Sequence, residues 1–442
     1  MSELKTLMQN AGIVGAGGAG FPSYAKLADG ADTLVINGAE CEPLIYTDFY
    51  LMHEHFDEFL RGINLVLDGG NIPKCVIGIK EHTAERLGLS DWQHLSERIS
   101  VRTMPNAYPM GDEINLIYQV TGRVVSPGAL PITAGVIVYN VETVYNIAKA
   151  EKGENLTEKW ITVGGDIKNR KIIRTPIGMA VKDIFKNLGI TVPDTHIVID
   201  GGPSMGKIIN YESAVVTKTT KSILVLPKNI PAVTGKMASH KTHNTHAQSN
   251  CCQCTRCTDM CPRALLGYPL EPHRLVRSVL SVAEADPEII KTASLCCSCG
   301  VCEIAACCQG ISPRAVIEQL KGILAKNRIK YVSDKTPAVN PQRDYRLMPS
   351  ERWMELLGVH KMDKMPEFAP EMQKTNKVKL LLKQSIGAPV TPTVGIGDMV
   401  KKGDLIATND GGLFVPLHAS IDGKVTAIDS VSIEIEKTEG VR

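Results

Sequence analysis

The spacing of the cysteines limits what this chain can fold into more than any other feature. Eleven of its 13 cysteines lie between Cys251 and Cys308, in two separate runs. The first run reads C-x-x-C-x-x-C-x-x-x-C and is followed at once by Pro262. Three thiolates in so short a loop can hold three corners of one iron–sulfur cube, and the fourth corner must come from elsewhere in the fold. The sequence therefore predicts a segment organised around two 4Fe-4S clusters.

We expect the ligands to cross between the runs, because the fourth cysteine of such a run normally serves the other cluster. The two expected metal-binding sets are Cys251, Cys254, Cys257 and Cys307 for one cluster, and Cys296, Cys299, Cys302 and Cys261 for the other. The second run departs from the pattern, because Cys307 comes one position late and Cys308 stands where a proline is expected. Either of these two can therefore be the last ligand. The remaining thiols, Cys252 and Cys297, are interpreted as packed neighbours, as is Cys308 if Cys307 is the ligand.

Two other uses of clustered cysteines are less consistent with this pattern. Zinc sites also use C-x-x-C pairs, but they usually take two ligands from each loop, whereas here three occur in a row and a proline follows. A disulfide framework is typical of short secreted chains, and this chain has 442 residues. Iron and sulfur remain the favoured interpretation.

Length and charge exclude several classes of function. A chain of 442 residues is expected to contain about three domains. The net charge is only +2, so no basic field favours nucleic acid. No apolar stretch approaches the ~18 residues of a membrane span, and the N-terminus has no basic region followed by an apolar one. We expect a cytoplasmic protein without a membrane span.

The N-terminal part alternates short apolar runs with helical spacing, which predicts an α/β domain over residues 1–150. Strands are expected at residues 34–36, 75–79, 100–102 and 136–139, with a largely parallel sheet. Ligands of such sheets bind beyond the carboxyl ends of the strands. The polar residues that directly follow these strands are therefore the candidate binding residues.

The rest of the chain divides into four further segments. Residues 155–230 predict a small α+β unit of the β-grasp type, and residues 231–250 a linker or flexible loop containing His240, His243 and His246, for which a metal site is the alternative. Residues 251–330 predict a helical, ferredoxin-like two-cluster domain, followed by an irregular connector. Residues 377–442 predict a barrel-sandwich segment similar to a lipoyl domain. Its hairpin tip at residues 409–412 has no lysine, so we expect no lipoate.

A glycine-rich loop near the N-terminus suggests contact with a phosphate. Gly15, Gly17 and Gly20 satisfy G-x-G-x-x-G, but a helix rather than a strand is expected before them, so a standard dinucleotide fingerprint is not favoured. Glycines permit close approach of the backbone to an anion, and a helix after Phe21 and Pro22 would direct its first N–H groups at that anion. A mobile turn remains the alternative interpretation.

Three polar segments fit a flavin. Residues 37–43 follow the first strand, residues 108–113 open a helix, and residues 140–143 follow the last strand. Amides and carboxylates there can hydrogen-bond a ribityl chain. The alternative for Asp112 and Glu113 is that they are ordinary acids at a helix start, where the helix dipole favours negative charge.

In the same order, these segments resemble those of one family, which contains the FMN- and NADH-binding subunit of respiratory complex I and the C subunit of the Rnf complex. The β-grasp, two-cluster and barrel-sandwich segments extend the resemblance to most of the chain. It implies a Rossmann-like FMN/NADH domain, and FMN contacts from Gly15, Gly17, Gly18, Gly20, Lys26, Asn37, Tyr108, Gly111, Asp112, Asn140 and Thr143. The residues implied to face NADH are Phe21, Glu40, Glu42 and Glu113. Complex I has an acid where this chain has Ala39, which weakens one FMN contact.

Within that family, the C-terminal position of the barrel-sandwich segment and the displaced Cys307 are most similar to the cobalamin reductases of propanediol-utilisation microcompartments. The resemblance implies electron flow from NADH through FMN and two 4Fe-4S clusters to the cobalt of cobalamin, in support of a cobalamin-dependent diol dehydratase, with no side chain acting as catalytic acid or base. It further implies a microcompartment location and an adenosyltransferase or shell protein as partner. The alternatives are a soluble NADH-input subunit of an Rnf-like ferredoxin oxidoreductase complex and a non-enzymatic iron–sulfur docking scaffold.

Overall fold

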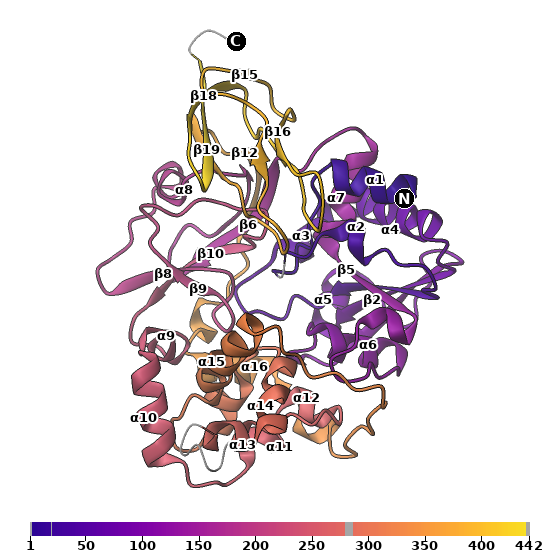
Figure 1. Cartoon of the computed structure of the whole chain (residues 1–442), viewed down its shortest axis with the longest axis vertical. Helices are drawn as coiled ribbons and strands as arrows, with labels where there is room; N and C mark the ends of the chain where they lie inside the picture. The colour runs from indigo at the N-terminus through magenta and orange to yellow at the C-terminus, as the bar shows by residue number, and fades with distance from the viewer. Residues whose placement is uncertain (1, 19, 279–285, 439–442) are drawn as a thin grey trace.

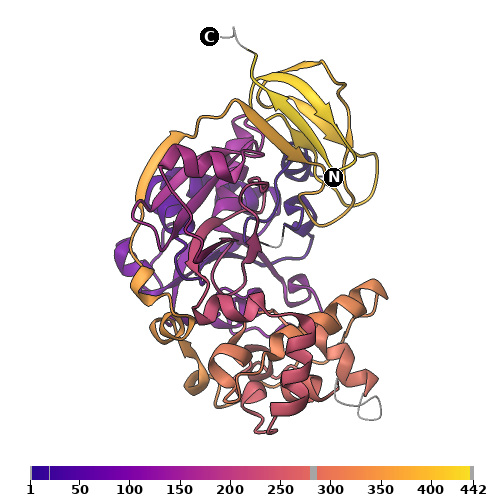
Figure 2. The same cartoon turned by 90° about the vertical axis from the view of Figure 1, so that its left-hand side faces the viewer.

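The computed structural model describes residues 2–18, 20–278 and 286–438. A helical segment occupies one end of the molecule and a C-terminal β unit the other, with two sheet-containing units between them (Figures 1 and 2). This combination of sheets and helices confirms the predicted multidomain α/β and α+β class. Within the described ranges, no helix is both long and apolar enough to cross a membrane.

The N-terminal unit is built on four parallel strands, as the sequence predicts, and the structure shows that their order is β3-β2-β1-β5. The strands are β1 Thr33–Gly38, β2 Lys74–Lys80, β3 Ile99–Met104 and β5 Val136–Asn140. The helices are α1 Glu3–Asn10, α2 Ser23–Lys26, α3 Thr47–Glu54, α4 Phe56–Gly69, α5 Glu81–Arg86, α6 Glu113–Thr121, η1 Pro131–Ala134 and α7 Val141–Glu151. Helices α4 and α7 touch at Gly62, where a Cβ would lie 1.9 Å from the Val144 carbonyl oxygen, so only glycine fits.

The apolar sequence of β1 explains why this strand lies in the interior of the N-terminal unit. Leu34, Val35 and Ile36 in β1 are all fully buried, as is typical of a parallel strand that is covered on both faces. Strand β1 pairs with β5 in a register that sets Asn37 beside Asn140 at the carboxyl end of both strands. The loops that follow the strands therefore meet at one edge of the sheet.

The second sheet has six strands in the order β12-β7-β6-β10-β8-β9. Its elements are β6 Glu158–Gly165, β7 Lys171–Pro176, α8 Val181–Leu188, β8 His196–Asp200, β9 Lys207–Ile209, β10 Ser222–Pro227 and β12 Glu367–Met372. The hairpin, helix and parallel return of β10 onto β6 have the topology expected of a β-grasp unit. Strand β12 was not predicted, because it comes from the connector and contains Pro370, which is tolerated at the edge of a sheet.

Residues 231–250, which the sequence predicts to be a linker or loop, form two helices, α9 Pro231–Met237 and α10 His240–Asn250. Ser239 begins α10 by accepting a hydrogen bond from the Thr242 amide, at 3.1 Å. The buried residues His243 and Ala247 face inward, and His243 is hydrogen-bonded to the Gly235 carbonyl at 3.2 Å. Helix α10 packs through few apolar residues, which explains why the composition of residues 231–250 suggested a loop.

The helical segment follows the pattern predicted for residues 251–330. It contains α11 Arg256–Asp259, α12 Pro262–Leu265, α13 Pro272–Arg277, α14 Pro287–Thr292, η3 Ala293–Leu295, the π-turn η4 Cys302–Ala306 and α15 Pro313–Lys326. The connector then forms η5 Asp344–Arg346, β11 Met348–Pro349, α16 Ser350–Leu357 and η6 His360–Met362. Strand β11 pairs with β4 Ala107–Tyr108 and so attaches the connector to the N-terminal unit.

The C-terminal unit consists of two facing sheets, β13-β19-β18-β15 and β14-β16-β17. The strands are β13 Lys377–Leu381, β14 Thr391–Pro392, β15 Met399–Val400, β16 Leu405–Thr408, β17 Leu417–His418, β18 Gly423–Ile428 and β19 Ser432–Glu436. Alternating buried residues such as Val378, Leu380, Ile433 and Ile435 form its core. This is the arrangement predicted for a barrel-sandwich segment.

Candidate iron–sulfur and flavin sites

The cysteines of the helical segment line two separate cavities. One is lined by Cys261, Cys296, Cys297, Cys299 and Cys302, of which Cys261, Cys299 and Cys302 are buried. The other is lined by Cys251, Cys252, Cys254, Cys257, Cys307 and Cys308, of which Cys252, Cys254 and Cys308 are exposed. We call them the buried and the exposed cysteine cavity. Each contains one of the two expected ligand sets.

The crossing of the runs is visible in these cavities. Cys261 belongs to the first run but lies in the buried cavity. After burial, the charge of Cys296 helps to raise the pKa of Cys261, and the charge of Cys261 helps to raise the pKa of Cys302. Cys307 belongs to the second run but lies in the exposed cavity, close enough to Cys257 to influence its ionisation. The ligand assignment itself stays a prediction.

The two cysteine loops repeat the same backbone conformation. Gln253 and Thr255 in the first run have positive φ, and Ser298 and Gly300 have positive φ at the matching positions of the second. A non-glycine residue rarely adopts this conformation, so its recurrence at equivalent sites indicates a shared geometric demand. That demand is to wrap consecutive thiols around one centre.

The π-turn η4 explains the late position of Cys307. Four positions separate Cys257 from Cys261, whereas five separate Cys302 from Cys307. A π-turn closes over one more residue than an α-turn, so η4 accommodates the extra residue and still directs the chain to the exposed cavity. There the Ile311 amide lies 3.3 Å from the Cys307 sulfur, which is thus held by a backbone donor.

The donor chemistry of both cavities fits iron–sulfur clusters. Burial raises the pKa of Cys261 to about 12 and that of Cys302 well above its ordinary value. A buried thiol of this kind is ionised only when a cation compensates the charge. Four sulfur ligands at one centre, without imidazole or carboxylate among the predicted set, fit Fe–S clusters, and the spacing of the cysteines favours these over zinc.

The glycine loop lies at the carboxyl edge of the parallel sheet. Its base is closed by the Gly15 amide, which donates to the Phe21 carbonyl at 2.8 Å. Gly18 and Gly20 have φ of 98° and 64°, and among the described residues, its chain neighbours aside, a Cβ at Gly18 would meet no atom within 4 Å. The Ala16 amide donates to the Thr143 hydroxyl at 3.0 Å, which holds the loop on α7. The expected helix after Phe21 and Pro22 is present but short, because α2 has four residues.

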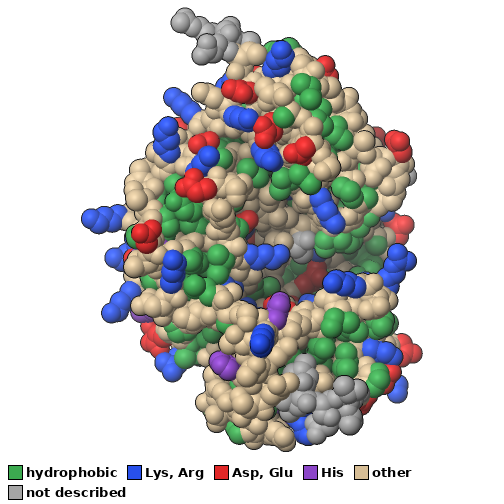
Figure 3. All heavy atoms as spheres, turned by 60° about the vertical axis from the view of Figure 1, so that its left-hand side comes forward, with side chains coloured by type: hydrophobic (Ala, Val, Ile, Leu, Met, Phe, Trp, Pro, Cys, Tyr) green, Lys and Arg blue, Asp and Glu red, His purple; other side chains and the backbone are tan. Residues whose placement is uncertain are grey.

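The polar residues after the strands gather beside this loop. The Asn37 amide donates to the Gly111 carbonyl at 2.9 Å. Asn140 caps α7 and donates to Asp48 at 2.7 Å. Lys26 forms an ion pair with Glu113 at 2.7 Å. The structure therefore brings these predicted residues together, and a hollow with acidic side chains inside it opens on the face shown in Figure 3.

Tyr108 and Asp112 connect this edge to the buried cysteine cavity. The Tyr108 hydroxyl donates to the Cys299 carbonyl at 2.8 Å, and its ring stacks on Trp353 of α16 at 4.6 Å. Asp112 caps α6 and forms an ion pair with Arg263 of α12 at 2.6 Å. Sequence reasoning missed Trp353 and Arg263, because both contacts span more than 100 residues.

Two of the three glutamates expected to face NADH, Glu40 and Glu42, also hold backbone amides. Glu40 accepts hydrogen bonds from the amides of Asp48, at 2.7 Å, and Phe49, at 3.1 Å. Burial, with a smaller effect from the Asp48 carboxylate, raises the pKa of Glu40 to about 8. Glu42 accepts from the amide of Ser204, at 2.9 Å, in the β-grasp unit, and burial raises its pKa as well. Their contact with NADH stays a prediction.

A buried ion-pair network joins the flavin edge to the β-grasp unit. Glu142 of α7 is 2.6 Å from Lys159 of β6 and 2.9 Å from Lys221. Lys221 also lies 2.5 Å from Asp48, which in turn accepts the hydrogen bond from Asn140. Nothing in the local sequence indicated this network, because its charges look like ordinary surface residues until the two units are packed together.

Family models match three parts of the chain that correspond to these features. The Nuo51 FMN-binding domain matches residues 8–149, the 4Fe-4S dicluster domain residues 250–312, and the RnfC barrel sandwich hybrid domain residues 360–441. Together with the two cysteine cavities, these matches define an oxidoreductase that binds FMN and 4Fe-4S clusters.

Curated relatives narrow this class. A cobalamin reductase PduS of Salmonella typhimurium is 37% identical over 435 residues, which cover 98% of this chain and 96% of that protein. The PduS of Citrobacter freundii is 37% identical over 434 residues, with the same coverage. The chain belongs to the family of these cobalamin reductases.

More distant similarities cover less of the chain. The C subunit of a Na(+)-translocating ferredoxin:NAD(+) oxidoreductase complex from Acetobacterium woodii is 35% identical over 266 residues, 59% of this chain and 57% of that one. The solved structure of an NAD+-reducing NiFe-hydrogenase in the H2-reduced state overlaps with a TM-score of 0.44 and 19% identity, over 78% of this chain and 63% of that one. An overlap of this extent carries no argument about activity.

Proposed function

We propose that the protein is an NADH-dependent cobalamin reductase that passes electrons through FMN and two 4Fe-4S clusters to the cobalt of cobalamin. The name of the relatives that align over nearly the whole chain supports the acceptor. One structural observation supports this path for the electrons. Tyr108 hydrogen-bonds the loop of the buried cysteine cavity from the flavin edge, whereas the other cavity opens to solvent. Electrons thus have an entry side and an exit side.

The residues at the sheet edge fit FMN. The glycine loop leaves open space at Gly18, and the amides of Asn37 and Asn140 lie side by side at the end of β1 and β5. When bound, FMN would accept the hydride of NADH and release its two electrons singly to the clusters. We assign to FMN Gly15, Gly17, Gly18, Gly20, Lys26, Asn37, Tyr108, Gly111, Asp112, Asn140 and Thr143, and to NADH Phe21, Glu40, Glu42 and Glu113.

The protein's own part in this reaction is positioning. Thr143 holds the glycine loop through the Ala16 amide, and Glu40 holds the start of α3 beside the same edge. The Asp112–Arg263 ion pair fixes the distance between α6 and α12, and therefore between the flavin edge and the buried cysteine cavity. No side chain is required to act as acid or base.

The two cysteine sets supply the clusters in our proposal. Cys296, Cys299, Cys302 and Cys261 hold the cluster nearer the flavin, and Cys251, Cys254, Cys257 and Cys307 hold the cluster at the exposed cavity. The second of these is the exit to the acceptor, because Cys254 is exposed and its other three thiols are only partly buried. We assign the FMN/NADH domain to residues 1–150, the β-grasp unit to 155–230, the two-cluster domain to 251–330 and the barrel-sandwich segment to 377–442.

We infer from family membership that the chain works in the cytoplasm inside a bacterial microcompartment, beside a cobalamin-dependent diol dehydratase. An adenosyltransferase or a shell protein would be the docking partner. Copurification of either with the tagged chain tests this inference.

A second candidate is the NADH-input subunit of an ion-translocating ferredoxin oxidoreductase, favoured by the similarity of 59% of the chain to such a subunit. The two candidates differ in their acceptor. Anaerobic oxidation of NADH with hydroxocobalamin, followed optically, should show reduction of cobalt. Its absence in protein fully loaded with FMN and iron, together with reduction of ferredoxin, would favour the second candidate.

A further inference from the structure

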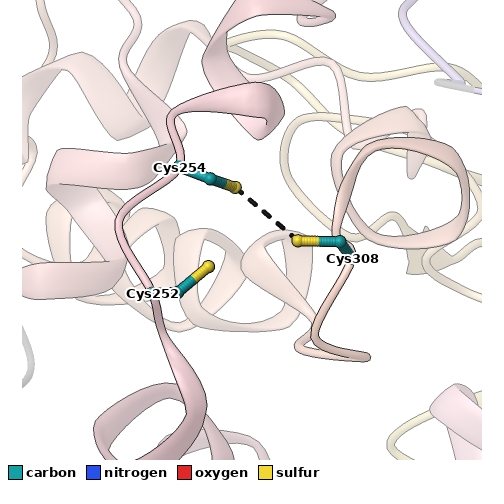
Figure 4. Close-up of side chains that lie close together, drawn as sticks. All are labelled: Cys252, Cys254 and Cys308. Atoms are coloured by element: carbon teal, nitrogen blue, oxygen red, sulfur yellow. Dashed lines mark hydrogen bonds between the residues drawn. The ribbon is translucent and has the colours of Figure 1, made fainter.

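Three exposed thiols lie together at the rim of the exposed cysteine cavity. The sulfurs of Cys252, Cys254 and Cys308 are all within 4.8 Å of one another, and those of Cys254 and Cys308 are 3.8 Å apart (Figure 4). The amide of Gln309 also points to the Cys252 sulfur, at 3.7 Å. Only Cys254 belongs to the proposed cluster ligands, so two neighbouring thiols have no assigned role.

The position of these two thiols in the chain is informative. Cys252 directly follows Cys251, and Cys308 directly follows Cys307, so each lies one residue beyond a proposed ligand of the same cluster. They come from the two different loops that enclose the exposed cavity. A covalent bond between them would therefore tie those loops together without using a ligand.

The buried cavity offers no such pair. It has one spare thiol, Cys297, which corresponds to Cys252 in the repeated loop. On its other side, Cys261 is followed by Pro262, in the place where Cys307 is followed by Cys308. Replacement of that proline by cysteine, at the solvent-exposed cavity alone, creates the pair.

We propose that Cys252 and Cys308 form a redox-active thiol pair that closes to a disulfide by exchange with low-molecular-weight disulfides. One thiolate attacks a disulfide RS–SR, breaks its S–S bond and releases RS−. The second thiolate then attacks the mixed disulfide and releases the other RS−. The pair loses two electrons and two protons, and the small disulfide becomes two thiols. A dithiol reverses the reaction.

The inference rests on the proposed assignment of Cys251, Cys254, Cys257 and Cys307 as ligands. It does not require cobalamin to be the acceptor, because the exchange needs no electron from NADH. Failure of cobalamin reduction and failure of the thiol pair are therefore separate results.

The test uses the iron-loaded, full-length protein, incubated anaerobically with oxidised glutathione. Peptide mapping after alkylation should show a Cys252–Cys308 disulfide and two fewer free thiols, and dithiothreitol should restore both thiols. Cys252→Ser and Cys308→Ser should each abolish the bond and keep the full iron content. Cys297→Ser, the matched spare thiol of the buried cavity, should leave the bond unchanged.

Three results would overturn the proposal. The first is wild-type protein whose Cys252 and Cys308 remain unlinked at equilibrium with oxidised glutathione. The second is a bond that involves Cys254 in iron-loaded protein. The third is a loss of cluster iron in Cys308→Ser but not in Cys307→Ser, because Cys308 would then be the ligand.

Discussion

Replacement of Lys218 tests whether a positive charge without a carboxylate partner is buried where the N-terminal, β-grasp and C-terminal units meet. It lies in the turn between β9 and β10 and is 2% exposed. Its ammonium donates to the carbonyl of Gly12, at 2.8 Å, just before the glycine loop, and to that of Pro416, at 2.7 Å, in the C-terminal unit. In the described parts of the chain it forms no salt bridge, and its titratable neighbour His418 is neutral, because burial lowers the pKa of His418 to about 3.

The expected effect of Lys218→Met depends on pH. Burial lowers the pKa of Lys218 from 10.5 to about 7, so between these values the unfolded chain binds more protons than the folded one. Folded wild-type protein therefore gains stability as pH rises, by about 1.4 kcal/mol per unit and by about 2.5 kcal/mol between roughly pH 7.5 and pH 9.5. The Met variant should lack this gain. Near pH 7 its net change should be small, because loss of two hydrogen bonds, each about 1–3 kcal/mol, offsets relief of the buried charge.

Lys221→Met provides a matched control three residues away. The carboxylates of Asp48 and Glu142 raise the pKa of Lys221 despite its burial. Its stabilising contribution is therefore present throughout this pH window and is lost only as the pH rises through its raised pKa. Urea unfolding of both variants and wild type, at several pH values, measures the differences. Parallel stability curves for wild type and Lys218→Met would refute the reasoning.

Three further predictions concern the relay and its supports. Cys302→Ala and Cys254→Ala should each lose about half of the iron and keep FMN, measured by iron and flavin analysis; loss of all iron from either would show that the clusters are not independent. Tyr108→Phe should cost about 1 kcal/mol in urea unfolding, the usual value of one hydrogen bond, and slow electron transfer from reduced flavin, whereas an unchanged rate would exclude this contact from the relay. Glu142→Gln should destabilise the chain by about 3–5 kcal/mol because it leaves Lys159 without its closest carboxylate, and a change below about 1 kcal/mol would contradict a buried pair.

Features encoded locally were predictable from the sequence. The parallel strands follow from continuous apolar runs. The grouping of the cysteines follows from their spacing, because three thiols at intervals of three positions in one loop lie close together. The gathering of Asn37, Gly111 and Asn140 follows from the rule that parallel strands end at one edge. Each of these inferences needs only short-range geometry and one topological rule.

Features that depend on packing between distant segments were not predictable. Strand β12 joins a sheet whose other strands end about 140 residues earlier, and α10 owes its formation to contacts of His243 and Ala247 rather than to helical spacing. Trp353 stacks on Tyr108 from a connector that reads as irregular. The partners of β12 and of Trp353 lie far along the chain, so a single sequence carries no signal for either pairing.

In our proposal, the different exposure of the two cysteine cavities gives the relay its direction. Cobalamin is a bulky molecule, and the thiols of Cys261, Cys299 and Cys302 are buried, so we expect it to take its electron at the exposed cavity, where Cys254 is accessible to solvent. Solvent exposure also influences the reduction potential of a cluster, so the two cavities need not have equal potentials even with the same four-sulfur ligand chemistry. If the ligands cross as we propose, the same two loops hold both clusters, because Cys261 and Cys307 would each bind the cluster of the other loop. A displacement of the exposed loop by a docking partner would therefore be transmitted to the buried cluster, and acceptor binding would alter the spectrum of both.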